Sequence, residues 1–136
     1  MFAGCGGLTD GTELPQKTIK YIQELGILDQ NEPILYYSTS YSFSWKVSGN
    51  FVTEKRVASF WQNHSPEDYV SSAYFEDIES IDIKYGDGFE FASALIIKTK
   101  NGEVFEAYFG VDGDRERMDN FYGEVVELWE KRKNKD

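Results

Sequence analysis

The chain has 136 residues, which suits one domain, and a domain of this size buries roughly two-thirds of the surface that its unfolded chain exposes. Its formal net charge of -10 opposes binding to nucleic acid or to an anionic lipid surface, because such binding needs clustered Lys and Arg. One Cys and one His exclude an internal disulfide and a zinc site built from four Cys or His ligands.

The N-terminal segment is rich in glycine, and we expect residues 1–13 to form a flexible leader. Within it, the stretch around Cys5 resembles the lipobox of bacterial lipoproteins, in which a small pair precedes a Cys that becomes lipidated. The charged and apolar regions of a complete signal are missing, and no later run approaches the ~20 apolar residues of a membrane helix. As written, the sequence predicts a cytoplasmic protein. Alternatively, a true start further upstream would make Cys5 the lipid attachment site of a cell-envelope lipoprotein, the one case in which we expect a membrane partner.

A single domain is expected over residues 14–136, and it begins with a short helix over residues 15–25. Pro15 suits the first helical turn and Gly26 suits the position after the last one. The apolar stripe of this helix consists of Ile19, Ile22 and Leu25.

Strands are expected between residues 33 and 111, because several runs alternate apolar and polar residues between turn residues. In chain order we expect strand 34–37, strand 41–47, turn 48–50, strand 51–62, loop 64–68, a helical turn at 74–78, strand 81–85 and a tight turn at 86–88.

A hairpin around Asn101-Gly102 ends the series of strands. The alternation of apolar and polar residues on its two strands distinguishes between two possible registers. A two-residue loop would pair Ile97 with the charged Glu106. A three-residue loop over residues 100–102, with Gly102 in the left-handed conformation, pairs Ile97 with Phe105 instead. The second register makes one apolar face, which also includes Leu95, Ala107 and Phe109. We predict that register.

The chain closes on an amphipathic helix expected over residues 114–132, with Asp112 or Asp114 as its N-cap. Its apolar residues recur at steps of three and four, and they are Met118, Phe121, Tyr122, Val125, Leu128 and Trp129. We expect the core to be sealed by Phe121, Val125 and Trp129. The basic residues at its end complement the helix macrodipole or, alternatively, form a nucleic-acid or lipid tail, and they are Lys131, Arg132, Lys133 and Lys135.

Six or seven antiparallel strands followed by one amphipathic helix is the order of a pleckstrin-homology-like (PH-like) bent barrel, a mainly β fold. Over residues 27–130 the local sequence resembles bacterial PH-like and GRAM-type domains. The resemblance rests on Asn31-Glu32-Pro33-Ile34-Leu35, on Phe51-Val52-Thr53-Glu54-Lys55-Arg56-Val57, on Tyr74-Phe75-Glu76-Asp77-Ile78 with Ile81, and on the final hairpin and helix. It implies a barrel closed at one end by its C-terminal helix, in a family whose members bind phosphoinositides, lipids or peptides.

One departure from that family concerns the first hairpin loop, which is basic in phosphoinositide-binding members. The corresponding loop, Ser38-Thr39-Ser40-Tyr41, has no positive charge, and Lys46 stands alone. We therefore expect no phosphoinositide partner.

No catalytic, cofactor-binding or metal site is expected. His64 lies in a polar loop without a nucleophile nearby, and Cys5 lacks a fixed partner in the leader. The sequence Asp112-Gly113-Asp114 is similar to the start of a calcium loop, but Arg117 occupies the position where that loop requires Gly.

Two groups of side chains leave alternatives open. Clustered carboxylates could support acid–base chemistry if burial separated their pKa values, whereas the helical set is expected to be a solvated face. These carboxylates are Glu76, Asp77, Glu79 and Asp82, and on the helix Glu124, Glu127 and Glu130. Several aromatic side chains either line a ligand groove or fill the core, and they are Tyr36, Tyr37, Tyr41, Trp45 and Trp61.

We therefore expect a non-catalytic binding module that contacts protein or a small apolar ligand. The alternative is a small ligand-binding protein or acid–base enzyme of a cone-shaped α+β fold that uses pocket carboxylates. The order of elements favours the module, because that cone-shaped fold places its long helices first and this chain places its long helix last.

Overall fold

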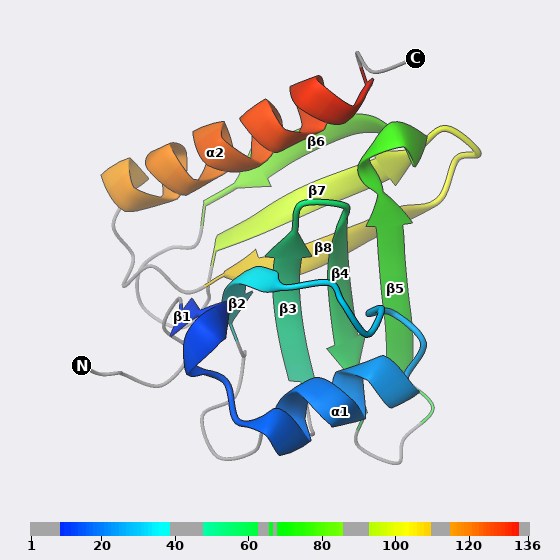
Figure 1. The fold of residues 1–136 in the computed structure, drawn as a ribbon. Coiled ribbons are helices and arrows are strands. Elements are labelled where there is room, and N and C mark those ends of the chain that lie inside the picture. The colour runs from blue at the N-terminus through cyan, green and yellow to red at the C-terminus, as the bar shows by residue number, and fades with distance from the viewer. Residues whose placement is uncertain are drawn as a thin grey trace.

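The computed structural model describes residues 9–38, 48–62, 66, 68–85, 93–109 and 115–133. Its elements are β1 (Thr9–Asp10), a 3-10 turn (Gly11–Glu13), α1 (Gln16–Glu24), β2 (Ile34–Ser38), β3 (Ser48–Thr53), β4 (Arg56–Trp61), β5 (Tyr69–Tyr74), a second 3-10 turn (Phe75–Asp77), β6 (Ile78–Lys84), β7 (Ser93–Thr99), β8 (Val104–Phe109) and α2 (Arg115–Lys133). Strands β1 to β5 form one sheet in that order, and β6 to β8 form a second (Figure 1). The predicted mainly β fold with a short first helix and a long last helix is confirmed.

The residues just before α1 belong to the sheet rather than to a leader. We expected residues 1–13 to be flexible, but β1 pairs with Tyr36 and Tyr37 of β2 in antiparallel register. Gly11, in the following 3-10 turn, is buried. The added strand supplies partners for backbone groups at the edge of β2, so the predicted leader boundary at residue 13 is wrong.

The β3–β4 hairpin corrects two further predictions. Residues 48–50, expected as a turn, begin β3, and the single strand expected over 51–62 is two strands. The chain turns between them because Thr53 Oγ1 accepts hydrogen bonds from the backbone N–H groups of Lys55 and Arg56, at 2.9 and 3.1 Å. The strand predicted over residues 41–47 and the turn at 86–88 lie outside the described residues.

Gly49 is needed for close packing and not for a turn. A Cβ at this position would lie 2.4 Å from the Tyr37 hydroxyl oxygen and 2.5 Å from a ring carbon of Phe60. Both distances are below van der Waals contact, so only Gly fits between these two rings.

The β7–β8 hairpin has the predicted register. Ile97 pairs with Phe105 and Leu95 with Ala107, and Gly102 has a φ of 97°. The observed register therefore belongs to the three-residue loop, which places the apolar residues of both strands on one buried face, as the alternation of apolar and polar residues predicted.

Two hydrophobic clusters lie on opposite faces of the five-stranded sheet. The first fills the space between the two sheets and is closed by α2 through Met118, Phe121 and Val125, with Trp129 partly buried beside them. The second lies under α1 and includes Ile22, Ile27, Leu28, Ile34, Tyr37, Phe51, Ala58 and Phe60. The predicted closure of the core by the last helix is confirmed.

Candidate functional site

Several residues weighed in the sequence lie outside the part of the chain that the structure describes. They are Cys5, Tyr41, Trp45, Lys46, His64, Asp112, Asp114 and Lys135. The lipid attachment at Cys5 and the absence of a site at His64 stay predictions. Among the described residues, no group of three or more His, Cys, Asp or Glu side chains is placed to hold a metal ion.

The clustered carboxylates are exposed, both those between residues 76 and 82 and those on α2, the helical set. The helical set is therefore the solvated face that the pattern predicted. One of its members, Glu124, accepts a hydrogen bond from the hydroxyl of Tyr36. No pair in either set is buried, so neither set has the buried environment that acid–base catalysis by paired carboxylates needs.

Of the three described aromatic residues of the candidate groove, Tyr36 and Tyr37 contribute to the cores. Tyr36 packs edge-on against Phe121 with ring centroids 5.2 Å apart, and Tyr37 is buried under α1. Trp61, at the end of β4, is half-buried. The two residues that lie on β2 therefore support the core interpretation.

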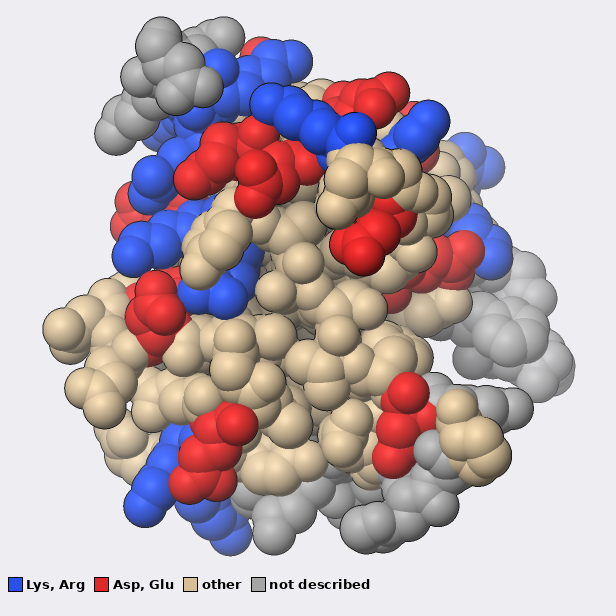
Figure 2. All heavy atoms as spheres, turned by 90° about the vertical axis from the view of Figure 1, so that its right-hand side faces the viewer, with Lys and Arg blue, Asp and Glu red and all other residues tan. Residues whose placement is uncertain are grey.

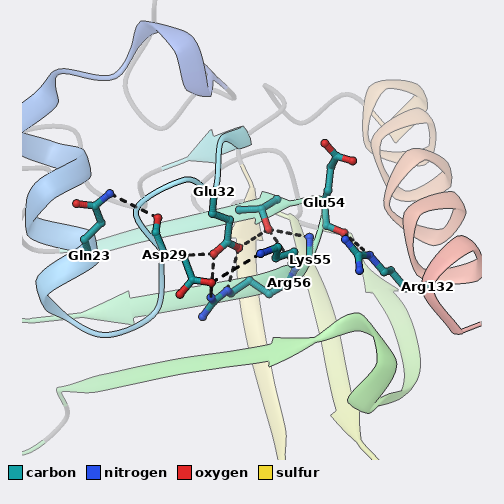
Figure 3. Close-up of polar contacts among 8 residues, drawn as sticks. Gln23, Asp29, Glu32, Glu54, Lys55, Arg56 and Arg132 are labelled. Atoms are coloured by element: carbon teal, nitrogen blue, oxygen red, sulfur yellow. Dashed lines mark hydrogen bonds and ion pairs between the residues drawn. The ribbon is translucent and has the colours of Figure 1, made fainter. Parts of the chain in front are cut away.

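A buried ion pair that the sequence analysis did not find joins the segment before β2 to the start of β4 (Figure 3). Arg56 donates from Nε and Nη2 to the two carboxylate oxygens of Glu32, at 2.9 and 2.8 Å. Thr53 Oγ1 and the backbone N–H of Asp29 also donate to this carboxylate, at 2.6 and 2.9 Å. Both charged side chains are at most 4% exposed.

The environment of Glu32 keeps it ionised. Burial alone raises the pKa of this carboxyl, but the hydrogen bonds from Arg56, Thr53 and Asp29 outweigh it and lower the pKa below its ordinary value. A carboxylate whose oxygens are already occupied by four donors is poorly placed to abstract a proton from a substrate. We therefore interpret the Glu32–Arg56 pair as a structural contact.

A surface groove of about 500 Å³ lies between α1, the first 3-10 turn and the segment before β2. Glu32 lies along it, together with amide side chains such as Gln16 and Gln23 and apolar ones such as Ile19 and Leu28. Its lining mixes apolar side chains with amide and carboxylate groups, so it does not by itself favour a small apolar ligand.

The outer edges of β6 and β8 are partly closed by other elements. From α2, the hydroxyl of Tyr122 donates to the Ile81 carbonyl at 2.8 Å, and Trp129 Nε1 donates to the Ile78 carbonyl at 3.2 Å. On β8, the backbone N–H of Tyr108 donates to Oδ1 of Asn50 at 3.0 Å. Side chains thus occupy backbone groups that would otherwise be free to pair with another strand.

The outer edge of β5 is different. The Phe75 N–H donates to the Lys55 carbonyl at 2.9 Å, which shows that alternate residues of β5 from that point direct their backbone groups toward β4. The intervening residues Val70, Ser72 and Tyr74 therefore direct N–H and C=O groups away from the sheet. No described element pairs with this edge, since β5 ends the order of its sheet.

The side chains along this edge are uncharged and exposed. Tyr69, Val70 and Tyr74 are 37%, 40% and 40% exposed, and they are among the few large apolar side chains exposed to this degree in the described residues. Figure 2 looks at the side where β5 lies and shows a broad central area of uncharged side chains, with both acidic and basic groups above and below it. The guanidinium of Arg56 lies over the Tyr74 ring at 4.6 Å, so the ion pair also supports this edge.

The elements form a PH-like β+α fold, in which no described element pairs with the outer edge of β5. The structure is similar to the crystal structure of a DUF1696 family protein with a pleckstrin-homology domain from Shewanella loihica PV-4, with a TM-score of 0.53 and 12% sequence identity. The match covers 90% of this chain and 98% of that one, so the likeness extends over the whole fold. No family model matches the chain, and a search of curated proteins finds no significant match.

The predicted PH-like fold is thus confirmed, and the cone-shaped α+β fold of the alternative reading is not the one observed. Within the described ranges, neither helix has the length and apolar character that crossing a membrane requires.

Proposed function

We propose that this protein is a non-catalytic protein-binding module that recognises an extended segment of its partner by adding it to the open edge of β5. The observation that carries the proposal is the outward row of backbone groups at Val70, Ser72 and Tyr74, which no described element covers. Strand addition gives affinity through the main chain and selectivity through alternate side chains. The PH-like fold of the similar structure supports a binding role in general, and the unpaired backbone groups of β5 support an extended protein segment as the ligand.

The remaining chemistry of the described residues supports a role without catalysis. The clustered carboxylates are exposed, and the one buried carboxylate, Glu32, is occupied by Arg56 and two further donors. A small apolar ligand is less well supported, because the groove beside α1 has a mixed lining. The GRAM-type resemblance, the absence of phosphoinositide and nucleic-acid binding, and lipidation at Cys5 stay predictions.

The proposal can be tested with a phage-displayed library of random twelve-residue peptides selected on the full chain. Selected peptides should bind the wild type, slow hydrogen exchange at the amides of Val70, Ser72 and Tyr74, and lose at least about tenfold in affinity for Ser72→Pro. Proline lacks the N–H that Ser72 presents to the edge, while an outward position on an edge strand tolerates it. Ser72→Thr keeps that N–H and is the matched control, so it should bind like the wild type.

Peptides that bind Ser72→Pro as tightly as the wild type would contradict the proposal. So would amide shifts confined to the groove beside α1, which would favour a different site. Vesicles of phosphatidylcholine with a few per cent of phosphoinositide serve as the second probe. We expect no saturable binding to them, and saturable binding would support a lipid-binding role instead.

A further inference from the structure

The charges at the two ends of β5 point to the chemistry of the partner. We infer that the occupant of this edge is an extended segment of another protein, with an uncharged centre about as long as β5 and a Lys or Arg at each end. This inference rests on the proposed function of the β5 edge. It is carried by charge complementarity, because the stretch 69–75 has no charged residue while Asp68 precedes it and Glu76 and Asp77 follow it.

These acidic residues lie at the ends of the strand and not along it. Glu76 and Asp77 are exposed in the second 3-10 turn, and Asp68 is half-buried directly before β5. At a rise of ~3.3 Å per residue, an extended partner spans the distance from residue 68 to residue 76 with roughly eight residues. A partner with a basic residue at each end therefore meets the exposed Glu76 and Asp77 at one end. At the other end it meets the half-buried Asp68, whose charge also acts on Tyr21. Opposite charges across paired strands are stabilising.

A second copy of this chain fits the same edge poorly. Antiparallel pairing of two β5 strands about Ser72 would place Val70 of each copy opposite Tyr74 of the other. The same register brings Asp68 of each copy toward the end of β5 in the other, where Glu76 and Asp77 follow in the 3-10 turn, so like charges approach each other at both ends. Each copy also carries a formal net charge of -10. These repulsions favour a different protein as the partner.

The centre of the edge selects for uncharged, strand-forming residues. Val70 and Tyr74 lie on one face of β5 and are both 40% exposed, so a paired strand buries them against its own side chains. Arg56 adds no free positive charge there, because it is bound to Glu32 while it covers the Tyr74 ring. A β-branched or aromatic residue in the partner matches this surface better than a charged one.

The test uses two synthetic peptides of alternating Thr and Val, one with Lys at each end and one with Glu at each end. Binding to the full chain is measured at low ionic strength by amide shifts and by titration. We expect the Lys-ended peptide to bind about tenfold more tightly, and the difference to shrink as salt is added. Glu76→Lys should reduce the difference in affinity between the two peptides. Glu127→Lys makes the same charge change at an exposed position on α2 and should leave that difference unchanged.

The possible outcomes separate this inference from the function on which it rests. If both peptides slow exchange at Val70, Ser72 and Tyr74 with equal affinity, the edge binds strands, but the inferred preference for basic residues at the ends of the partner is wrong. If neither peptide reaches these amides, the proposed function itself fails. A concentration-dependent dimer that Ser72→Pro abolishes would identify a second copy as the occupant. Protection of the same amides in the free monomer would mean that the chain covers its own edge, and this too would overturn the inference.

Discussion

The edge strands β6 and β5 differ in whether their outward backbone groups have hydrogen-bond partners among the described residues. At β6, Tyr122 and Trp129 of α2 donate hydrogen bonds to two outward backbone carbonyls, and the helix that carries them also closes the first hydrophobic cluster. At β5, outward N–H and C=O groups face no described element, and exposed Val70 and Tyr74 lie beside them. The β6 edge is thus closed in part by α2, whereas no described element closes the β5 edge.

If β5 binds an extended partner as proposed, its edge must also be selective. A long uncovered strand is a template for pairing with any other strand, and natural proteins commonly limit this with charge or with short edges. Here β5 is uncharged along its length, and acidic residues occupy only its ends. Main-chain pairing stays possible in the middle, while like charges at the ends disfavour acidic partners and self-association. The predictions below test this contrast.

The largest expected effect concerns the ion pair that supports the β5 side. Glu32→Gln should lower the free energy of unfolding by up to about 3–5 kcal/mol, because the buried Arg56 then keeps only its longer contact with the exposed Asp29, at 3.5 Å. Urea unfolding followed by circular dichroism measures it. Glu79→Gln is the control, since Glu79 and Lys98 form an exposed pair at 3.9 Å worth at most about 1 kcal/mol. Equal decreases in the free energy of unfolding of the two variants would show that the buried pair stabilises the fold no more than the exposed pair does.

The pH dependence of stability follows from the same carboxylate. Because the folded state lowers the pKa of Glu32, the unfolded state binds more protons as the pH falls below the ordinary value of 4.5. The stabilisation is therefore fully present above that value and is lost as the pH falls through the lowered pKa. Unfolding curves recorded between about pH 6 and pH 3 should show a smaller acid-induced loss for Glu32→Gln than for the wild type. Parallel losses in both proteins would contradict the assignment.

The sequence revealed the parts of the molecule in which burial repeats along one element. The stripe of α2 and the register of Ile97 with Phe105 follow from such a repeat, and both predictions are confirmed. Strand β5 was missed, because its exposed residues outnumber its one buried residue and no alternation marks it. The Glu32–Arg56 pair was missed because 24 residues separate its members, and only the folded sheet brings them together.

Proline substitutions at two neighbouring serines test which residues of β5 direct their N–H groups toward β4. Ser71→Pro should cost about 2–3 kcal/mol, because the N–H of Ser71 points toward its partner Ser59 on β4 and its loss leaves a carbonyl unpaired. Ser72→Pro should cost less than about 1 kcal/mol, because the N–H of Ser72 points away from the sheet. Urea unfolding of both variants measures the difference. The reverse order would mean that the outward and inward positions along β5 have been exchanged.

The smallest expected effect compares two tyrosine hydroxyls, one at the closed β6 edge and one under α1. Tyr122→Phe removes the hydrogen bond to the Ile81 carbonyl and should lower the free energy of unfolding by about 1 kcal/mol. Tyr37→Phe removes a hydroxyl that is buried without a hydrogen-bond partner among the described residues, and whose pKa is raised first by burial and then by Tyr21. Because an unpaired buried hydroxyl costs free energy, this substitution should raise the free energy of unfolding by up to about 1 kcal/mol. The chemical change is the same in both variants, so opposite signs in thermal and urea unfolding would isolate the hydrogen bond that α2 makes to β6. A loss of similar size in both would show that the Tyr37 hydroxyl has a hydrogen-bond partner of its own.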